Sequence, residues 1–128
     1  MKSLVDTHVI LWFTAGDERL PTKYRKLLEQ SSRELSFSAV SAVEISTKFV
    51  RGKLRLPGVP SVYIPQVISD LRLVPLAITM EHATGVSHLP LHHADPFDRL
   101  LIAQARSENL PIITSDKAFR RYDVDVIW

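Results

Sequence analysis

Four carboxylates stand where short apolar segments end or where helices begin: Asp6, Glu44, Asp98 and Asp116. Carboxylates held a few ångströms apart repel one another and raise one another's pKa values unless a cation neutralises them. If the fold brings the four together, we expect a divalent ion among them. Such an ion can make a bound water acidic enough to attack a phosphodiester.

The ligand types available restrict which ion would bind. The chain has no cysteine, and the one histidine pair at helical spacing, His88 and His92, is interrupted by Pro90. Oxygen ligands therefore remain, and they favour Mg²⁺ or Mn²⁺ over Zn²⁺.

Each acid also has an ordinary structural explanation. Ser41-x-x-Glu44 matches a helix capping box, and Asp95 before Pro96 is a typical N-cap residue. Asp98 lies in the first turn of the expected helix, and Asp116 precedes another short turn. Acidic side chains are favoured at both places, because a helix N-terminus attracts negative charge. Asp6 is harder to explain in this way, because an acid directly after a buried strand must find polar partners. These alternatives stay open for each acid alone, and only the four together favour a shared site.

Other polar residues near the four acids have two interpretations each. His8 either lines the site or is packed or faces solvent. His92 and His93 adjoin Asp95 and either contact substrate or point in different directions, and they form no metal-ligand triad. Lys48 has the spacing of a helical ion pair with Glu44. The basic residues that continue from Lys48 to Arg55 are either a solvated face or a rim that binds phosphates.

The hydrophobic pattern predicts which elements must position these residues. Strands are expected near residues 3–6, 35–38, 73–76, 111–116 and 124–128. Helices are expected near residues 9–15, 21–30, 41–51, 61–70, 79–88 and from Pro96 onward, with Ser61 and Asp95 as N-caps and Pro65 in an opening turn. Alternating strands and helices predict a mostly parallel sheet covered on both faces, with ligands at the carboxyl ends of its strands.

Composition sets the broad class. The 128 residues are 45% hydrophobic and 23% charged, which fits a single domain over residues 1–128. The net charge of +2 is compatible with a polyanionic partner without requiring one. The first residues leave no room for a signal-peptide core, and no apolar run reaches the ~20 residues of a membrane span. We therefore expect a soluble, cytoplasmic protein with no membrane association.

Four motifs together resemble the PIN-domain family, and more closely its VapC-type toxins. They are Leu4-Val5-Asp6-Thr7-His8, Ser41-Ala42-Val43-Glu44-Ile45, Asp95-Pro96-Phe97-Asp98-Arg99-Leu100-Leu101-Ile102-Ala103-Gln104-Ala105 and Thr114-Ser115-Asp116. The resemblance spans Leu4 to Trp128, and it implies a three-layer α/β/α fold around a short, mostly parallel sheet.

The resemblance also implies a function. It implies an endoribonuclease toxin that depends on Mg²⁺ or Mn²⁺, with Asp6, Glu44, Asp98 and Asp116 as its metal-binding catalytic acids. Asp95 would be a second-shell ligand or an N-cap, and Ser115 a small hydroxyl residue near the metal. The implied partners are RNA, a second copy of the chain in a homodimer, and a VapB-like antitoxin whose tail enters the acidic groove.

Three other classes of protein compete with this interpretation. A receiver domain needs an acid pair after the first strand, but Thr7 follows Asp6. A phosphatase of the haloacid dehalogenase type needs a second Asp where His8 stands. The stronger alternative is a PIN-like module that binds RNA or a protein partner with little or no turnover, because four acids indicate metal binding before they indicate cleavage.

Overall fold

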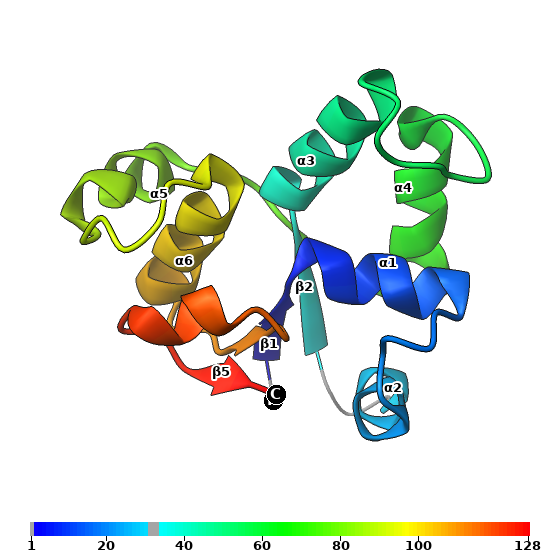
Figure 1. The fold of residues 1–128 in the computed structure, drawn as a ribbon, viewed down its shortest axis with the longest axis horizontal. Helices are drawn as coiled ribbons and strands as arrows, with labels where there is room; N and C mark the ends of the chain where they lie inside the picture. Colours follow the sequence, from blue (N-terminus) through cyan, green and yellow to red (C-terminus); the bar gives the residue numbers. More distant parts are fainter. Residues whose placement is uncertain (1, 31–33) are drawn as a thin grey trace.

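A computed structural model describes residues 2–30 and 34–128 of the chain. Its centre is a five-stranded sheet in which every pairing is parallel, with the strand order β3-β2-β1-β4-β5 (Figure 1). The strands are β1 (Lys2–Val5), β2 (Glu34–Ser38), β3 (Val74–Leu76), β4 (Ile112–Ile113) and β5 (Val126–Ile127). This confirms the predicted α/β class and parallel sheet.

The central strands are apolar because helices cover both faces of the sheet. Leu4 on β1 pairs with Ile112 on β4, and Val5 pairs with Ile113. Leu4 and Ile112 belong to one buried cluster, whereas Val5 and Ile113 belong to another. Successive side chains of a strand point to opposite faces, so these continuous apolar runs fill two separate cores.

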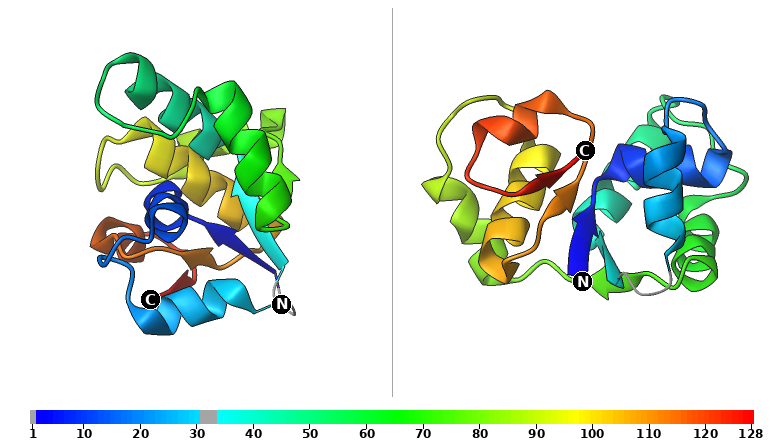
Figure 2. Two further views of the ribbon diagram at one scale, coloured as in Figure 1. Left: turned by 90° about the vertical axis from the view of Figure 1, so that its right-hand side faces the viewer. Right: turned by 90° about the horizontal axis from the view of Figure 1, so that it is seen from below.

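The helices form the two outer layers of an α/β/α sandwich (Figure 2). They are α1 (Thr7–Ala15), α2 (Thr22–Glu29), α3 (Ala39–Val50), α4 (Pro60–Asp70), α5 (Met80–Gly85), η1 (Val86–His88), α6 (Pro96–Glu108) and η2 (Lys117–Arg121). Buried side chains of α1, α2 and α4 fill the first core, and those of α6 and η2 fill the second. Helix α3 lies between the two cores, because it gives Ile45 to the first and Val40 to the second.

Three details of the predicted elements are wrong. Helix α3 begins at Ala39 with Ser38 as its N-cap, so Ser41 lies inside the helix and forms no capping box with Glu44. Helix α4 begins at Pro60 after Val59, so Ser61 is not its N-cap. Pro65 lies in the interior of that helix instead of its first turn, on an exposed side that leaves the buried contacts intact.

The prediction for α6 is confirmed. Asp95 is its N-cap, with a side chain that accepts hydrogen bonds from the backbone N–H groups of Phe97 and Asp98, and Pro96 opens the helix. Pro occurs at this first position because its missing N–H would have no helical partner there. The cap fixes where α6 starts, and it thereby places Asp98 at the carboxyl edge of the sheet.

The strand predictions are confirmed at β3, where Pro75 lies on an edge strand as its missing N–H requires. The predicted strand over 111–116 is shorter, since β4 pairs only through Ile112 and Ile113. Within the ranges 2–30 and 34–128, none of the helices combines the length and hydropathy that a membrane crossing needs.

Candidate active site

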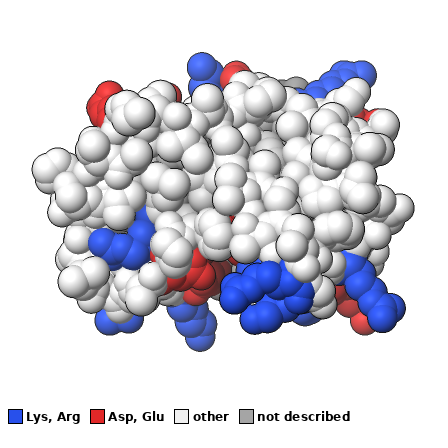
Figure 3. Space-filling model, turned by 90° about the horizontal axis from the view of Figure 1, so that it is seen from above, with Lys and Arg blue, Asp and Glu red and all other residues white. Residues whose placement is uncertain are grey.

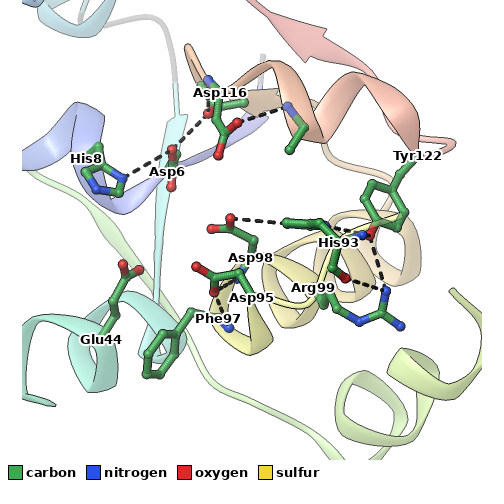
Figure 4. A network of polar contacts seen from close by, with 12 residues as sticks. Asp6, His8, Glu44, His93, Asp95, Phe97, Asp98, Arg99, Asp116 and Tyr122 are labelled. Carbon is green, nitrogen blue, oxygen red and sulfur yellow. Dashed lines mark hydrogen bonds and ion pairs between the residues drawn. The ribbon is translucent and has the colours of Figure 1, made fainter. Parts of the chain in front are cut away.

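The predicted acids meet at the carboxyl edge of the sheet, where β1 and β4 end and where α1, α3 and α6 begin (Figure 4). Asp6 directly follows β1, Glu44 lies in α3, Asp98 lies in the first turn of α6, and Asp116 precedes η2. The charges of Asp6, Glu44, Asp95 and Asp116 all raise the pKa of Asp98. The fold therefore gathers carboxylates from four separate segments of the chain.

Asp6 is almost fully enclosed, with 2% of its surface exposed. It occupies the N-cap position of α1, but its side chain makes no capping bond. Its Oδ2 accepts a hydrogen bond from the Thr114 hydroxyl at 2.8 Å, whereas its Oδ1 is buried without a partner. Burial raises the pKa of Asp6 to about 6, against the opposing effect of the Thr114 hydrogen bond.

Glu44 is buried to the same degree, and again only one of its two carboxylate oxygens has a partner. Its Oε2 contacts Lys48 Nζ at 2.6 Å, which confirms the predicted ion pair one helical turn apart. Its Oε1 is buried without a hydrogen-bond partner. Two carboxylates from different segments of the chain thus each keep one buried oxygen unpartnered, an arrangement that costs free energy unless something binds there.

Among the acids of the site, Asp98 has the pKa that is raised most. Its pKa is raised to about 8, mainly by burial and then by the charges of Asp95, Asp6, Asp116 and Glu44, in that order. Its Oδ2 lies 3.3 Å from His93 Nε2. In the absence of a cation, this site therefore holds a proton on Asp98 at neutral pH.

The two outer acids have structural roles that the sequence analysis left open. Asp95 Oδ1 accepts hydrogen bonds from the N–H groups of Phe97 at 2.9 Å and Asp98 at 3.1 Å. Asp116 Oδ1 accepts one from the N–H of Ala118 at 2.9 Å. Both side chains are exposed, and both act as helix caps while adding negative charge near Asp98.

Hydroxyl and amide groups hold the acid-bearing elements against one another. The Thr7 hydroxyl of α1 donates to Ser41 Oγ of α3 at 2.8 Å. Ser38, which caps α3, donates to the side-chain oxygen of Gln104 on α6. The Thr114 hydroxyl contacts Asp6 and also accepts the backbone N–H of Asp116 at 3.0 Å. Every acid-bearing segment is therefore tied by a buried polar contact to a neighbouring one.

The structure shows a contact to Asp98 that the sequence analysis missed. His93 Nδ1 lies 2.7 Å from the hydroxyl of Tyr122, and that hydroxyl accepts a hydrogen bond from Arg99 Nη1 at 3.2 Å. The Tyr122 proton is then directed to His93 Nδ1, which leaves the ring proton on Nε2, facing Asp98. Tyr122 lies 29 residues from His93, so only the folded chain reveals the pair.

Two other histidines named in the sequence analysis, His8 and His92, lie farther from Asp98 than His93 does or make no contact with an acid. His8 Nδ1 is 4.0 Å from Asp6 Oδ2, and 51% of the side chain is exposed, so it borders the site on the solvent side. His92 packs its ring edge-on against Tyr122 without reaching an acid. Ser115 is half-buried, and the hydroxyl that contacts Asp6 belongs to the residue before it, Thr114.

The donor set suits a hard divalent cation. The carboxylate oxygens Asp6 Oδ1 and Glu44 Oε1 are buried and unpartnered, and Asp98 holds a proton that a nearby cation would displace. Over the described ranges, no three carboxylate or imidazole groups already stand close enough to enclose an ion. Mg²⁺ keeps several waters among its ligands, so it does not need a closed cage of protein groups.

Basic side chains flank the acids on the surface. Figure 3 shows the acidic group in a hollow, with Lys and Arg side chains on either side of it. The Lys and Arg side chains attract a polyanion to this part of the surface, and the carboxylates between them attract a cation.

Comparison with known proteins assigns the chain to a family. The family model for the PIN domain matches residues 3–125. The chain belongs to the PIN-domain family. It is also 26% identical, over 93% of its length and 90% of the relative's, to Ribonuclease VapC22 of Mycobacterium tuberculosis (strain ATCC 25618 / H37Rv).

Solved structures support the same fold. VapBC2 from Rickettsia felis, bound to a DNA fragment from its promoter, superposes with a TM-score of 0.73 at 15% identity, covering 100% of this chain and 99% of that one. VapBC-1 from nontypeable Haemophilus influenzae superposes with a TM-score of 0.68 at 18% identity, covering 99% and 97%. At these identities the likeness concerns the fold alone.

Proposed function

We propose that this protein is an endoribonuclease toxin that depends on Mg²⁺ or Mn²⁺ and hydrolyses RNA phosphodiester bonds. The observation that carries the proposal is the pair of buried, unpartnered oxygens, Asp6 Oδ1 and Glu44 Oε1, beside the protonated Asp98. Membership of the PIN-domain family and the similarity to a ribonuclease support the reaction class.

Asp6, Glu44, Asp98 and Asp116 would hold the ion, with Asp95 and Ser115 in supporting positions. When bound, a divalent ion lowers the pKa of a coordinated water and neutralises charge that develops on a phosphate oxygen. Lys48 keeps Glu44 Oε2 engaged and so presents Oε1 to the site. Thr114 does the same for Asp6, and His93 holds Asp98 through Nε2.

We further propose that residues 1–128 form one PIN domain that acts in the cytoplasm, as a homodimer and with a VapB-like antitoxin. The support is that several proteins of similar fold are VapBC complexes, including VapBC-5 from Mycobacterium tuberculosis, which has a TM-score of 0.64 at 18% identity and covers 98% of this chain and 97% of its own. A positively charged antitoxin tail would meet complementary charge at the acids.

A cleavage assay tests the enzymatic proposal. Purified protein and total cellular RNA are incubated with EDTA, Mg²⁺ or Mn²⁺, and the cleavage sites are mapped for wild type, Asp98→Asn and Asp70→Asn. Asp70 is an exposed acid whose contact with Gln66 an Asn preserves, so it is the matched control. We expect metal-dependent cleavage that Asp98→Asn abolishes and that Asp70→Asn leaves unchanged. Cleavage that persists in EDTA would refute the metal mechanism.

The alternative function, a PIN-like module that binds RNA or a partner with little turnover, gives a different result in the same assay. Such a module would retain RNA or partner binding and show no cleavage with any divalent ion.

The toxin role has its own test, since expression should arrest growth and co-expression of a neighbouring open reading frame should relieve the arrest. Harmless expression of folded protein would contradict it.

A further inference from the structure

A second hollow adjoins the acidic site and includes part of the basic run from Lys48 to Arg55. It has a volume of about 410 Å³ and lies between α1 and the segment 53–57 that follows α3. His8 and Lys48 line its inner end, and these are the residues that contact Asp6 and Glu44. The hollow, which we call the basic groove, therefore begins where the acidic site ends.

The charges in the basic groove are mostly positive. Arg19, Lys48, Lys53 and Arg55 line it, together with a single acid, Asp17. Arg19 neutralises Asp17 through a two-pronged contact, with Nη2 at 2.7 Å from Oδ2. Among the described residues, no acid forms an ion pair with Lys53 or Arg55. The two cations Lys53 and Arg55 in this groove are thus available to an anionic ligand.

The rest of the lining is apolar and aromatic. Leu54, Leu56 and Trp12 contribute to it, and the guanidinium of Arg19 lies over the Trp12 ring at 5.3 Å. At the outer end, Tyr63 from α4 joins Thr14 from α1 through their hydroxyls at 2.7 Å. The volume is in the range of roughly 300–1,000 Å³ that small-ligand sites occupy, which suits one unpaired nucleotide and is too small for a duplex.

We propose that the basic groove binds the single-stranded RNA segment next to the phosphodiester that is cut. This proposal rests on the ribonuclease function proposed above and adds where the substrate lies. Lys53 and Arg55 contact backbone phosphates, and the apolar lining receives a base. Cationic rims over aromatic and apolar surface are typical of sites for unpaired nucleic acid, whereas a peptide of acidic residues alone would have no group to bury on that surface.

Binding is tested without cleavage, using fluorescence anisotropy of a 5′-fluorescein octauridine RNA in EDTA. The test variant is Lys53→Ala/Arg55→Ala. The matched control is Lys2→Ala/Lys26→Ala, which removes the same charge from exposed residues on β1 and α2. Lys48 is left intact because its loss would also change Glu44. We expect roughly tenfold weaker binding in the test variant, with a salt slope of log K reduced by about 1.4, and little change in the control.

Two further measurements place the RNA. In a Trp128→Phe background Trp12 is the only tryptophan, and its fluorescence should be quenched as RNA binds. With Mn²⁺, the test variant should raise KM for RNA cleavage and leave kcat unchanged, because the groove residues do not touch the reacting phosphate. Equal weakening in both double variants, absence of quenching, or binding of polyglutamate in preference to RNA would each overturn the proposal.

The outcome separates this proposal from the ribonuclease function. Wild type that cleaves RNA, with a test variant that binds RNA as wild type does, overturns the basic groove alone. Wild type that binds RNA in the groove but cleaves none with any divalent ion overturns the ribonuclease function alone.

Discussion

Replacing Asp98 by Asn should stabilise the metal-free protein even though it removes a proposed catalytic acid. The pKa of Asp98 rises from its ordinary value of 3.8 to about 8 in the folded chain. Between these two values the folded chain holds a proton that the unfolded chain has released. The free energy of unfolding of wild type therefore falls as pH rises through this window, and Asn removes the effect.

The magnitude follows from the size of the shift. Each pKa unit corresponds to about 1.36 kcal/mol, and about three units separate 3.8 from pH 7, which sets an upper limit of about 4 kcal/mol. Salt screening and movement of the exposed Asp95 and Asp116 side chains reduce this, so we expect a gain of about 1–3 kcal/mol at pH 7.

Urea denaturation in EDTA between pH 4.5 and pH 8.5 measures the effect. The difference between Asp98→Asn and wild type should be small at pH 4.5 and should widen up to about pH 8, while Asp70→Asn stays within about 0.5 kcal/mol of wild type throughout. Adding Mg²⁺ should then stabilise wild type and leave Asp98→Asn unchanged. A variant less stable than wild type at pH 7, or a difference that does not depend on pH, would refute the reasoning.

Three further predictions concern the groups that hold the acids. His93→Leu should weaken Mn²⁺ binding about tenfold or more, because Asp98 loses its hydrogen-bond donor, while His93→Gln, which keeps a donor, and His92→Leu should not; equal effects of His92→Leu and His93→Leu in a calorimetric titration would contradict this. Asp95→Ala should lower the free energy of unfolding by about 1 kcal/mol, measured by thermal denaturation, because helix α6 loses its N-cap. Asp95→Asn should keep the cap and the stability; an equal loss with Asn would show that the cap is not the cause. Gln104→Leu should cost about 1–3 kcal/mol in urea denaturation, because Ser38 is left buried without its acceptor; a cost below about 0.5 kcal/mol would show that this contact does not stabilise the fold.

The sequence was informative where function and fold depend on local patterns. The Asp95-Pro96 start of α6 predicts its own helix, because an N-cap and a proline at the first position are local signals. Alternation of apolar strands with helices predicts a parallel sheet, and a parallel sheet carries the residues after its strands to one edge. This is why the convergence of Asp6 and Asp116 could be predicted before any coordinates.

Features that depend on distant partners could not be predicted in this way. Ser41 matched a capping box, but Ser38 is the N-cap, and its hydroxyl also reaches Gln104, which is 66 residues away. The capping contacts of Asp95 and Asp116 became visible only with their backbone partners. His93 gave no signal in the sequence, because its tautomer is determined by Tyr122 and Arg99 across the fold.

Proton release on Mn²⁺ binding tests the central claim most directly. Calorimetric titrations at pH 7 in two buffers of different ionisation enthalpy give the number of protons released per ion. Because Asp98 is protonated in the metal-free site, we expect about one proton to be released by wild type and none by Asp98→Asn, with much weaker binding in the variant. Equal Mn²⁺ affinity in the two proteins, with no proton released by either, would contradict it.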